Sequence, residues 1–169
     1  MNLKITLTAA LFAVLGLGNI TAQASPMPSL SGAEQWLNSP PLDAAALKGK
    51  VVLVDFWTWD CINCQRSQPH VIDWSRKYAD QGLVVIGVHT PEYDYEHDID
   101  TLRSRVASLG IDYPVAADND YRIWSAWGNQ VWPAHYFVDK QGQVRAAHFG
   151  EGKYAEQEAL IRELLEEGE

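Results

Sequence analysis

An apolar, β-branched run followed closely by two cysteines constrains this chain more than any other feature. Residues 51–57 read Val-Val-Leu-Val-Asp-Phe-Trp, a pattern typical of a strand that is buried on both faces. Shortly afterwards, Cys61 and Cys64 open a segment whose apolar residues, among them Val71 and Trp74, recur at helical spacing. The two cysteines are therefore expected in the first turn of a helix that follows a buried strand.

Strands and helices alternate along the rest of the chain. We expect further strands at residues 83–88, 134–138 and 144–149, a short extended piece at 113–116, and helices at 61–80, 101–109, 119–127 and 154–167. The last two strands form a hairpin, because the turn residues 139–142 join them. This order predicts one domain with an α/β sandwich architecture and a mixed sheet.

The N-terminal residues are predicted to be an export signal. Lys4 supplies a positive start, residues 5–18 form an apolar core, and Ala22-Gln23-Ala24 fits a cleavage site. The apolar run is shorter than the roughly 20 residues that a spanning helix needs, so an uncleaved anchor is the less favoured alternative. We divide the chain into a signal peptide (residues 1–24), a lead-in without periodicity (residues 25–41) that begins as a flexible tether, and a folded domain (residues 42–169).

Composition excludes several classes of protein. With 47% hydrophobic and 21% charged residues, the chain is neither disordered nor a multi-span membrane protein. Its net charge of −9 argues against nucleic acid as a partner, since phosphate binding needs a basic face. Two cysteines are too few for a disulfide framework, so the pair is not needed to hold the fold together.

The cysteine pair indicates redox chemistry. At a helix N-terminus, free N–H groups and the macrodipole stabilise a thiolate, so Cys61 is expected to be the exposed attacking sulfur. Cys64 lies one turn further on, where it can close a disulfide or resolve a mixed disulfide. The alternatives are a zinc half-site and an inert structural disulfide. A closed zinc site lacks ligands here, because the sequence has no second CxxC and no suitably spaced pair of histidines.

Two further residues support this interpretation. Asp55 lies in the apolar strand, six residues before Cys61, and is suited to exchange a proton with the second thiol; the alternative is a hydrogen-bonding role at a strand end. Pro133 precedes the hairpin, where a proline belongs at the start of a strand. A cis peptide bond at Pro133 would expose backbone groups to an extended substrate.

Several motifs taken together resemble the thioredoxin superfamily, and more closely the DipZ branch of the TlpA-like thioredoxin proteins. The resemblance runs from about Leu42 to Leu165. It rests on the segments Val54-Asp55-Phe56-Trp57-Thr58-Trp59-Asp60-Cys61-Ile62-Asn63-Cys64, Gly87-Val88-His89-Thr90-Pro91-Glu92, Asp118-Asn119-Asp120-Tyr121, Trp132-Pro133-Ala134-His135-Tyr136 and His148-Phe149-Gly150-Glu151-Gly152, with Pro69 as a helix kink.

The resemblance implies a thioredoxin-like three-layer sandwich with a central mixed sheet over residues 42–169. It also implies a periplasmic thiol–disulfide oxidoreductase, with Cys61 as nucleophile, Cys64 as resolving cysteine, a redox-active disulfide between them, and a cis bond at Pro133. Protein thiols and disulfides are then the partners, no cofactor is required, and reductase work is favoured. Proteins of this branch usually carry the domain on a membrane electron-transfer module; the electron donor of this chain is left open, with a membrane-embedded donor as one candidate.

The sequence also departs from the family pattern near the cysteines. Ile62-Asn63 replaces the Gly-Pro of thioredoxin, so the reduction potential of thioredoxin does not carry over. Asp60 adds a negative charge that opposes thiolate formation nearby. Trp132 is bulkier than the residue usual before the proline. We expect some of Trp57, Trp59 and Trp132 to form an apolar rim that docks a partner.

Two other functions remain open. Thr58-x-x-Cys61 is similar to the peroxidase pattern of peroxiredoxins, although Val54 stands where that pattern has proline. His135 and His148 are expected on adjacent hairpin strands, and either could join the cysteines in a copper site.

Acidic residues at positions 92, 94, 96, 98 and 100 form a further distinctive run. The run lacks the spacing of a calcium loop and is expected to be a solvated loop whose last acids favour the next helix.

Overall fold

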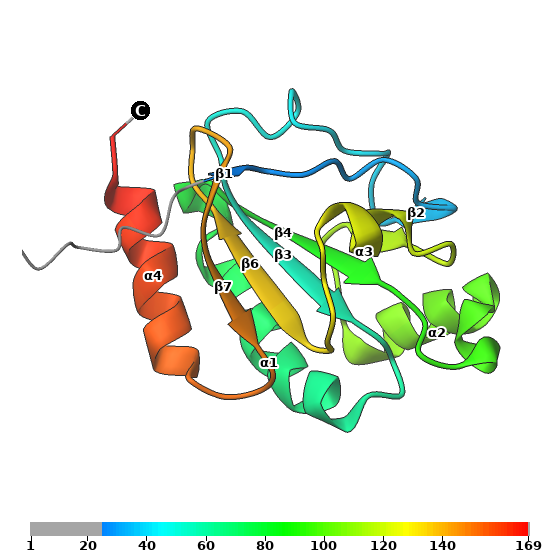
Figure 1. The fold of residues 1–169 in the computed structure, drawn as a ribbon. Helices are drawn as coiled ribbons and strands as arrows, with labels where there is room; N and C mark the ends of the chain where they lie inside the picture. The colour runs from blue at the N-terminus through cyan, green and yellow to red at the C-terminus, as the bar shows by residue number, and fades with distance from the viewer. Residues whose placement is uncertain (1–24, 169) are drawn as a thin grey trace, which may run out of the picture.

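A seven-stranded mixed sheet organises residues 25–168, which are the residues that the computed structural model describes (Figure 1). The strands are β1 (Ser25–Pro26), β2 (Gln35–Leu37), β3 (Val51–Trp57), β4 (Leu83–His89), β5 (Val115–Ala117), β6 (Ala134–Val138) and β7 (Gln143–Phe149). Their spatial order is β1-β7-β6-β3-β4-β5-β2. The predicted signal peptide, residues 1–24, lies outside the described residues.

The apolar run singled out in the sequence is the central strand. All seven residues of β3 are buried, as expected for a strand that is covered on both faces. β3 pairs in parallel with β4 and antiparallel with β6, in a register that sets Asp55 opposite His135 and Phe56 opposite Ala134. The start of β6 therefore lies at the same end of the sheet as the loop that follows β3.

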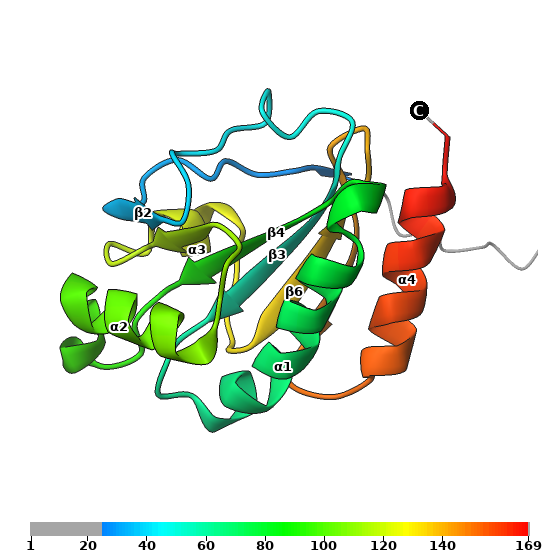
Figure 2. The same cartoon turned by 180° about the vertical axis from the view of Figure 1, so that it is seen from behind.

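Helices and loops cover both faces of the sheet. The helices are α1 (Ile62–Lys77), α2 (Ile99–Leu109), α3 (Arg122–Ala126) and α4 (Tyr154–Glu166), with short 3-10 turns η1 (Ala79–Gln81) and η2 (Asp94–His97). Side chains alternate along β3, so Leu53 and Trp57 pack with α1, α2 and α4, whereas Val54 and Phe56 pack with α3. Figure 2 shows α1 and α4 side by side over one face of the sheet. The three-layer sandwich with a mixed sheet is thereby confirmed. Within the same residues, no helix combines the length and the apolar character that crossing a membrane requires.

The lead-in is not the flexible tether that its composition suggested. Its first residues form β1, which pairs with β7 at one edge of the sheet, and β2 pairs with β5 at the other edge. Leu30, between these strands, is buried in the core. Without this segment, β7 and β5 would have backbone groups that lack partners. The segment supplies those partners even though its sequence shows no periodicity.

Element boundaries differ from the prediction at the short helices. α3 begins at Arg122 rather than Asn119, because the Asp118 carboxylate accepts hydrogen bonds from the backbone N–H groups of Ile123 and Trp124. α1 runs through Pro69 and ends at Lys77, and a separate 3-10 turn occupies the residues before Gly82. Hydrogen bonds like those that Asp118 accepts satisfy the free N–H groups of a first helical turn and so help to set where a helix starts.

Candidate functional site

Cys61 and Cys64 form a disulfide at the point where β3 passes into α1. Cys61 is the N-cap of α1, with extended backbone (φ −84°, ψ 114°), and its Sγ accepts a hydrogen bond from the backbone N–H of Cys64 at 3.1 Å. The two Cα atoms are 5.2 Å apart. Cys61 is partly exposed, whereas Cys64 is fully buried in the core. Only the first sulfur is therefore open to an incoming reactant.

A buried carboxylate holds the loop before Cys61 in place. Glu96, only 1% exposed, accepts hydrogen bonds from the Thr58 hydroxyl and from the backbone N–H of Asp60 at 3.1 Å. Its other oxygen accepts from the backbone N–H groups of Glu92 at 2.7 Å and Tyr93 at 3.0 Å. The prediction of a solvated acidic loop is wrong for Glu96, because four donors replace the water that its carboxylate would otherwise need.

The remaining acids of this run behave as predicted. Asp94, Asp98 and Asp100 are exposed. Asp98 is the N-cap of α2 and accepts a hydrogen bond from the backbone N–H of Thr101 at 2.7 Å. Hydrogen bonding from the side chain and then from the backbone of Thr101 lowers the pKa of Asp98. The acidic run thus divides into one buried carboxylate that supports the redox loop and exposed ones that face solvent or a helix end.

His89, at the end of β4, completes the support behind the loop and was not identified from the sequence. Its Nε2 lies 3.2 Å from the Thr58 hydroxyl oxygen, and the residue is fully buried. Because the hydroxyl hydrogen of Thr58 is directed to Glu96, Nε2 is the donor to that oxygen. Burial lowers the pKa of His89 to about 3, so the ring is neutral at ordinary pH.

Asp55 is buried on the face of β3 that carries α1. Its Oδ2 accepts a hydrogen bond from the Gln68 side-chain amide at 3.1 Å. Gln68 follows Cys64 by four residues, so the two side chains lie one turn apart on one face of α1. Asp55 is consequently bound by a side chain that follows Cys64 by one helical turn on α1. Gln68 was missed because a glutamine inside a helix carries no distinguishing signal in the sequence.

Pro133 lies immediately before β6, and its peptide bond with Trp132 is cis. The pairing of Ala134 with Phe56 brings this proline to the end of the sheet where α1 begins. Trp132 is partly buried; its Nε1 donates to the backbone carbonyl of Thr90 at 3.0 Å, and its ring centroid is 4.3 Å from that of Trp124. The indole next to the proline is thereby held in a fixed position.

The other predicted rim residues divide between surface and core. Trp57 is 1% exposed and belongs to the core, so it takes no part in a rim. Trp59 is partly exposed, with its ring centroid 5.5 Å from that of Tyr95 and the Arg105 guanidinium 4.7 Å above it. Tyr95 donates a hydrogen bond to Asp60 at 2.6 Å, which raises the pKa of Tyr95 to about 12. The acid beside Cys61 is therefore bound by a neutral phenol.

The two hairpin histidines lie on adjacent strands, as predicted; the register sets them directly opposite each other, with ring centroids 6.3 Å apart. His135 is fully buried, and its two ring nitrogens face Gln157 and Asp55 rather than the cysteines. Among residues 25–168, no three histidine, cysteine or acidic side chains gather in a way that could hold a metal ion.

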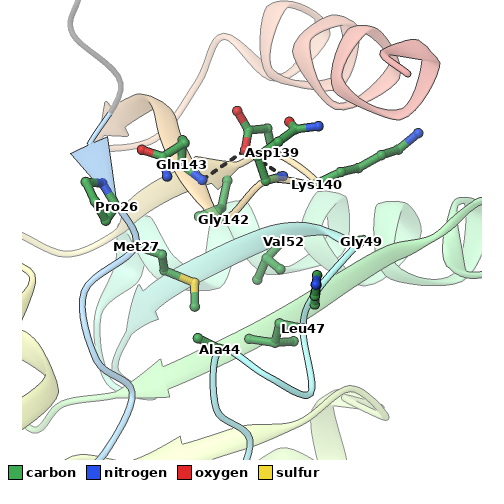
Figure 3. Close-up of a pocket in the computed structure, with 13 residues that line it drawn as sticks. Pro26, Met27, Ala44, Leu47, Gly49, Val52, Asp139, Lys140, Gly142 and Gln143 are labelled. Atoms are coloured by element: carbon green, nitrogen blue, oxygen red, sulfur yellow. Dashed lines mark hydrogen bonds between the residues drawn. The ribbon is translucent and has the colours of Figure 1, made fainter. Parts of the chain in front are cut away.

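A cavity of about 720 Å³ lies at the opposite end of the sheet from the disulfide (Figure 3). It is lined by Met27 and Leu47, by Val52 near the start of β3, and by the β6–β7 turn, in which the Asp139 carboxylate accepts hydrogen bonds from the backbone of Gln141 and Gln143. Neither cysteine borders this cavity. It is therefore separate from the redox site.

A disulfide at the first turn of the helix after a central strand, next to a proline-led antiparallel strand, defines a thioredoxin-like dithiol protein. Residues 25–147 match the AhpC/TSA family. The chain is 35% identical to the thiol-disulfide oxidoreductase YkuV of Bacillus subtilis, over 75% of this chain and 84% of that protein. A thioredoxin-like protein solved in its oxidized form superposes with a TM-score of 0.79 at 31% identity, covering 86% of this chain and 98% of that one.

The chain belongs to the AhpC/TSA family and, within it, to the thioredoxin-like thiol–disulfide oxidoreductases. It is also 51% identical to the protein DipZ of Mycobacterium tuberculosis over 141 residues, which are 82% of this chain. The chain spans only 20% of the length of that relative.

The neutral, buried state of His89 makes the fold sensitive to acid. The unfolded chain binds a proton at this residue near pH 6.5, whereas the folded protein binds it only near pH 3. The contribution of His89 to the free energy of unfolding is therefore lost as the pH falls between these values. We predict that, across this window, the free energy of unfolding changes less steeply with pH in His89→Gln than in the wild type. The two slopes should differ by about 1.4 kcal/mol per pH unit. Urea unfolding at several pH values measures this, and parallel pH curves for the two proteins would contradict it.

Proposed function

We propose that this protein is an exported thiol–disulfide reductase that acts on disulfides of other proteins through Cys61. The observation that carries the proposal is the unequal exposure of the two sulfurs: Cys61 reaches the surface, whereas Cys64 is sealed in the core. Such a pair favours one order of events, in which the outer sulfur captures a partner and the inner sulfur releases it.

The reaction follows from the positions of three side chains. In the reduced protein, the Cys61 thiolate, stabilised at the N-terminus of α1, attacks a partner disulfide and displaces one partner thiolate. Cys64 then gives its proton to Asp55 and attacks the Sγ of Cys61, which releases the second partner thiolate. The cysteines end as the disulfide and the partner as two thiols. Gln68 supports this role, since it lies one turn after Cys64 on α1 and donates a hydrogen bond to the carboxylate.

The docking surface is proposed to comprise Pro133, Trp132 and Trp59. Trp59 precedes Cys61 by two residues, Pro133 leads β6 at the same end of the sheet, and the Trp132 indole is fixed by its bond to Thr90. Two exposed apolar side chains lie close to these residues in the sequence: Ile62, which is 59% exposed, and Val131, which is 40% exposed. They add contact area for an extended segment of a partner. Partly apolar surfaces of this kind favour an unfolded or extended protein substrate.

The compartment and the electron source are also part of the proposal. Export rests on the charged start, apolar core and small-residue cleavage motif of residues 1–24. A reductase in an oxidising compartment must be recharged, and we propose a membrane-embedded dithiol donor because the family resemblance points to one. The reductase direction requires that the reduced pair be less stable, relative to its disulfide, than the thiols of its targets.

The peroxidase alternative has less support. Thr58 would have to direct its hydroxyl towards a peroxide bound at Cys61, but it is fully buried and donates instead to Glu96. The copper alternative would need a histidine near the cysteines, and His135 is engaged by Asp55 and Gln157.

Replacing the resolving cysteine tests the order of attack. We expect Cys64→Ala to accumulate covalent complexes with partner proteins, because Cys61 still attacks while nothing releases the captured thiol. The complexes are detected as bands that disappear on reduction, after the variant is expressed in an exporting host. Cys61→Ala is the matched control and should trap nothing; trapping by Cys61→Ala alone would reverse the assignment.

Replacing Asp55 tests its role as base. With an aromatic disulfide that releases a coloured thiolate, the first release reports attack by Cys61 and the second reports resolution by Cys64. We predict that Asp55→Asn slows the second release by about a hundredfold at neutral pH and much less at high pH, where the thiol ionises unaided. Asp80→Asn, at an exposed position, serves as control. Equal slowing at every pH would remove Asp55 from proton transfer.

A further inference from the structure

A chain of buried polar side chains runs from Gln68 on α1 through Asp55 on β3 and ends on a histidine to which the mechanism above gives no part. His135 lies opposite Asp55 in the pairing of β6 with β3, and its Nε2 is 3.4 Å from Asp55 Oδ1. Both residues are at most 1% exposed, and neither of these two atoms has another polar partner in the structure. A buried carboxylate oxygen and a buried ring nitrogen thus depend on each other.

The hydrogen-bond pattern on the far side of the ring fixes one of its protons. Gln157, on α4, donates through its Nε2 to the backbone carbonyl of Gly152 at 2.7 Å, which sets the orientation of the amide. Its Oε1 consequently faces His135 Nδ1, at 2.6 Å. Because an amide oxygen can only accept, Nδ1 must carry a hydrogen.

The far side of the carboxylate is fixed in the same way. Tyr113 donates its hydroxyl to Gln68 Oε1 at 2.8 Å, which leaves the amide nitrogen of Gln68 to donate to Asp55 Oδ2. Asp55 is therefore an acceptor at Oδ2, and only its Oδ1 faces the histidine. Without a proton between Oδ1 and Nε2, a carboxylate and a lone pair would confront each other in the core, which is costly at low dielectric.

We propose that His135 is a positioning residue for thiol–disulfide exchange: as an imidazolium it donates through Nε2 to Asp55 Oδ1 and keeps the carboxylate ionised, ready to take the proton of Cys64. The inference rests on the proposed role of Asp55 as base. In the step itself, the Cys64 proton moves to Asp55, the Cys64–Cys61 bond forms, and the bond from Cys61 to the partner sulfur breaks. The partner leaves as a thiolate that takes its proton from water, and Asp55 afterwards returns its own proton to solvent.

The groups around the ring agree with this charge. Burial lowers the pKa of His135, but the proximity and negative charge of Asp55, together with Gln157, outweigh it and raise the pKa above its ordinary value. On β7, His148 has its pKa lowered by burial and by the charge of His135, so it stays neutral. On the α1 side, burial and the charge of Asp55 raise the pKa of Tyr113 well above its ordinary value. The facing residue of α4, Gln157, carries no charge, so among residues 25–168 Asp55 is the one anion in contact with the ring.

The protonation state of His135 can be read directly in the unaltered protein. Nitrogen-15 NMR of the imidazole is expected to show both ring nitrogens protonated in the oxidised wild type at neutral pH. In Asp55→Asn, which lacks the anion, the Nε2 proton should be lost. A neutral His135 ring in the wild type at neutral pH would overturn the proposal, whether or not any variant folds.

The kinetic consequence is tested with His135→Gln, whose amide can still donate to Asp55 but carries no charge. Without the cation, Asp55 loses the charged partner that favours its ionised form. We expect the pH profile of the second thiolate release to shift upward by about one unit, with a roughly tenfold slower release at neutral pH and convergence with wild type at high pH. The first release should be unchanged, and His148→Gln should leave both releases unchanged.

The possible outcomes distinguish a failure of the His135 proposal from a failure of the proposed function on which it rests. Uniform slowing of His135→Gln at all pH values would indicate a merely structural histidine and overturn the proposal. If His135→Gln shows no shift while Asp55→Asn does, the base is Asp55 alone and the proposed function stands. If Asp55→Asn itself has no pH-dependent effect, the proposed proton transfer fails and the positioning role of His135 fails with it.

Discussion

The placement of one sulfur at the N-terminus of α1 is the constraint on which the rest of this structure depends. β3 must end with Trp57 buried and α1 must begin at Ile62, so the intervening residues have to turn sharply while holding Cys61 at the helix cap. Cys61 Sγ already accepts a backbone hydrogen bond from Cys64 in the disulfide form. A thiolate generated there meets free N–H groups without any rearrangement of the backbone, which is the physical basis of its reactivity.

Buried polar groups, rather than apolar packing alone, keep that turn rigid. Glu96 gathers donors from the redox loop and from its own loop, and the Thr58 hydroxyl links it to His89. Within the sheet, Asp55 of β3 and His135 of β6 form a second buried polar pair. The network around Glu96 thus holds the loop before Cys61 in place, and the pair of Asp55 and His135 joins β3 to β6.

The sequence predicted the parts of this site that have strong local signals. The apolar run of β3, the CxxC and the proline before β6 are contiguous patterns, and each lies where the patterns placed it. Glu96, Gln68 and Gln157 could not be found in that way. Their roles depend on contacts with partners that are distant in the sequence: Thr58 is 38 positions from Glu96, Asp55 is 13 from Gln68, and His135 is 22 from Gln157. The fold creates these contacts, and no local sequence pattern records them. Edge strands β1 and β2 escaped prediction for a similar reason, since sheet pairing and not periodicity defines them.

The acidity of the Cys61 thiol in the reduced protein is the most direct test of the central claim. The rate of Cys61 alkylation against pH, measured in Cys64→Ala so that one thiol reports, gives the pKa of that thiol. The placement of Cys61 at the helix cap predicts a value at least about one unit below the ~8.5 of a free cysteine. A value at or above that of free cysteine would contradict the account, because the helix terminus would then contribute nothing to the reactivity of the sulfur.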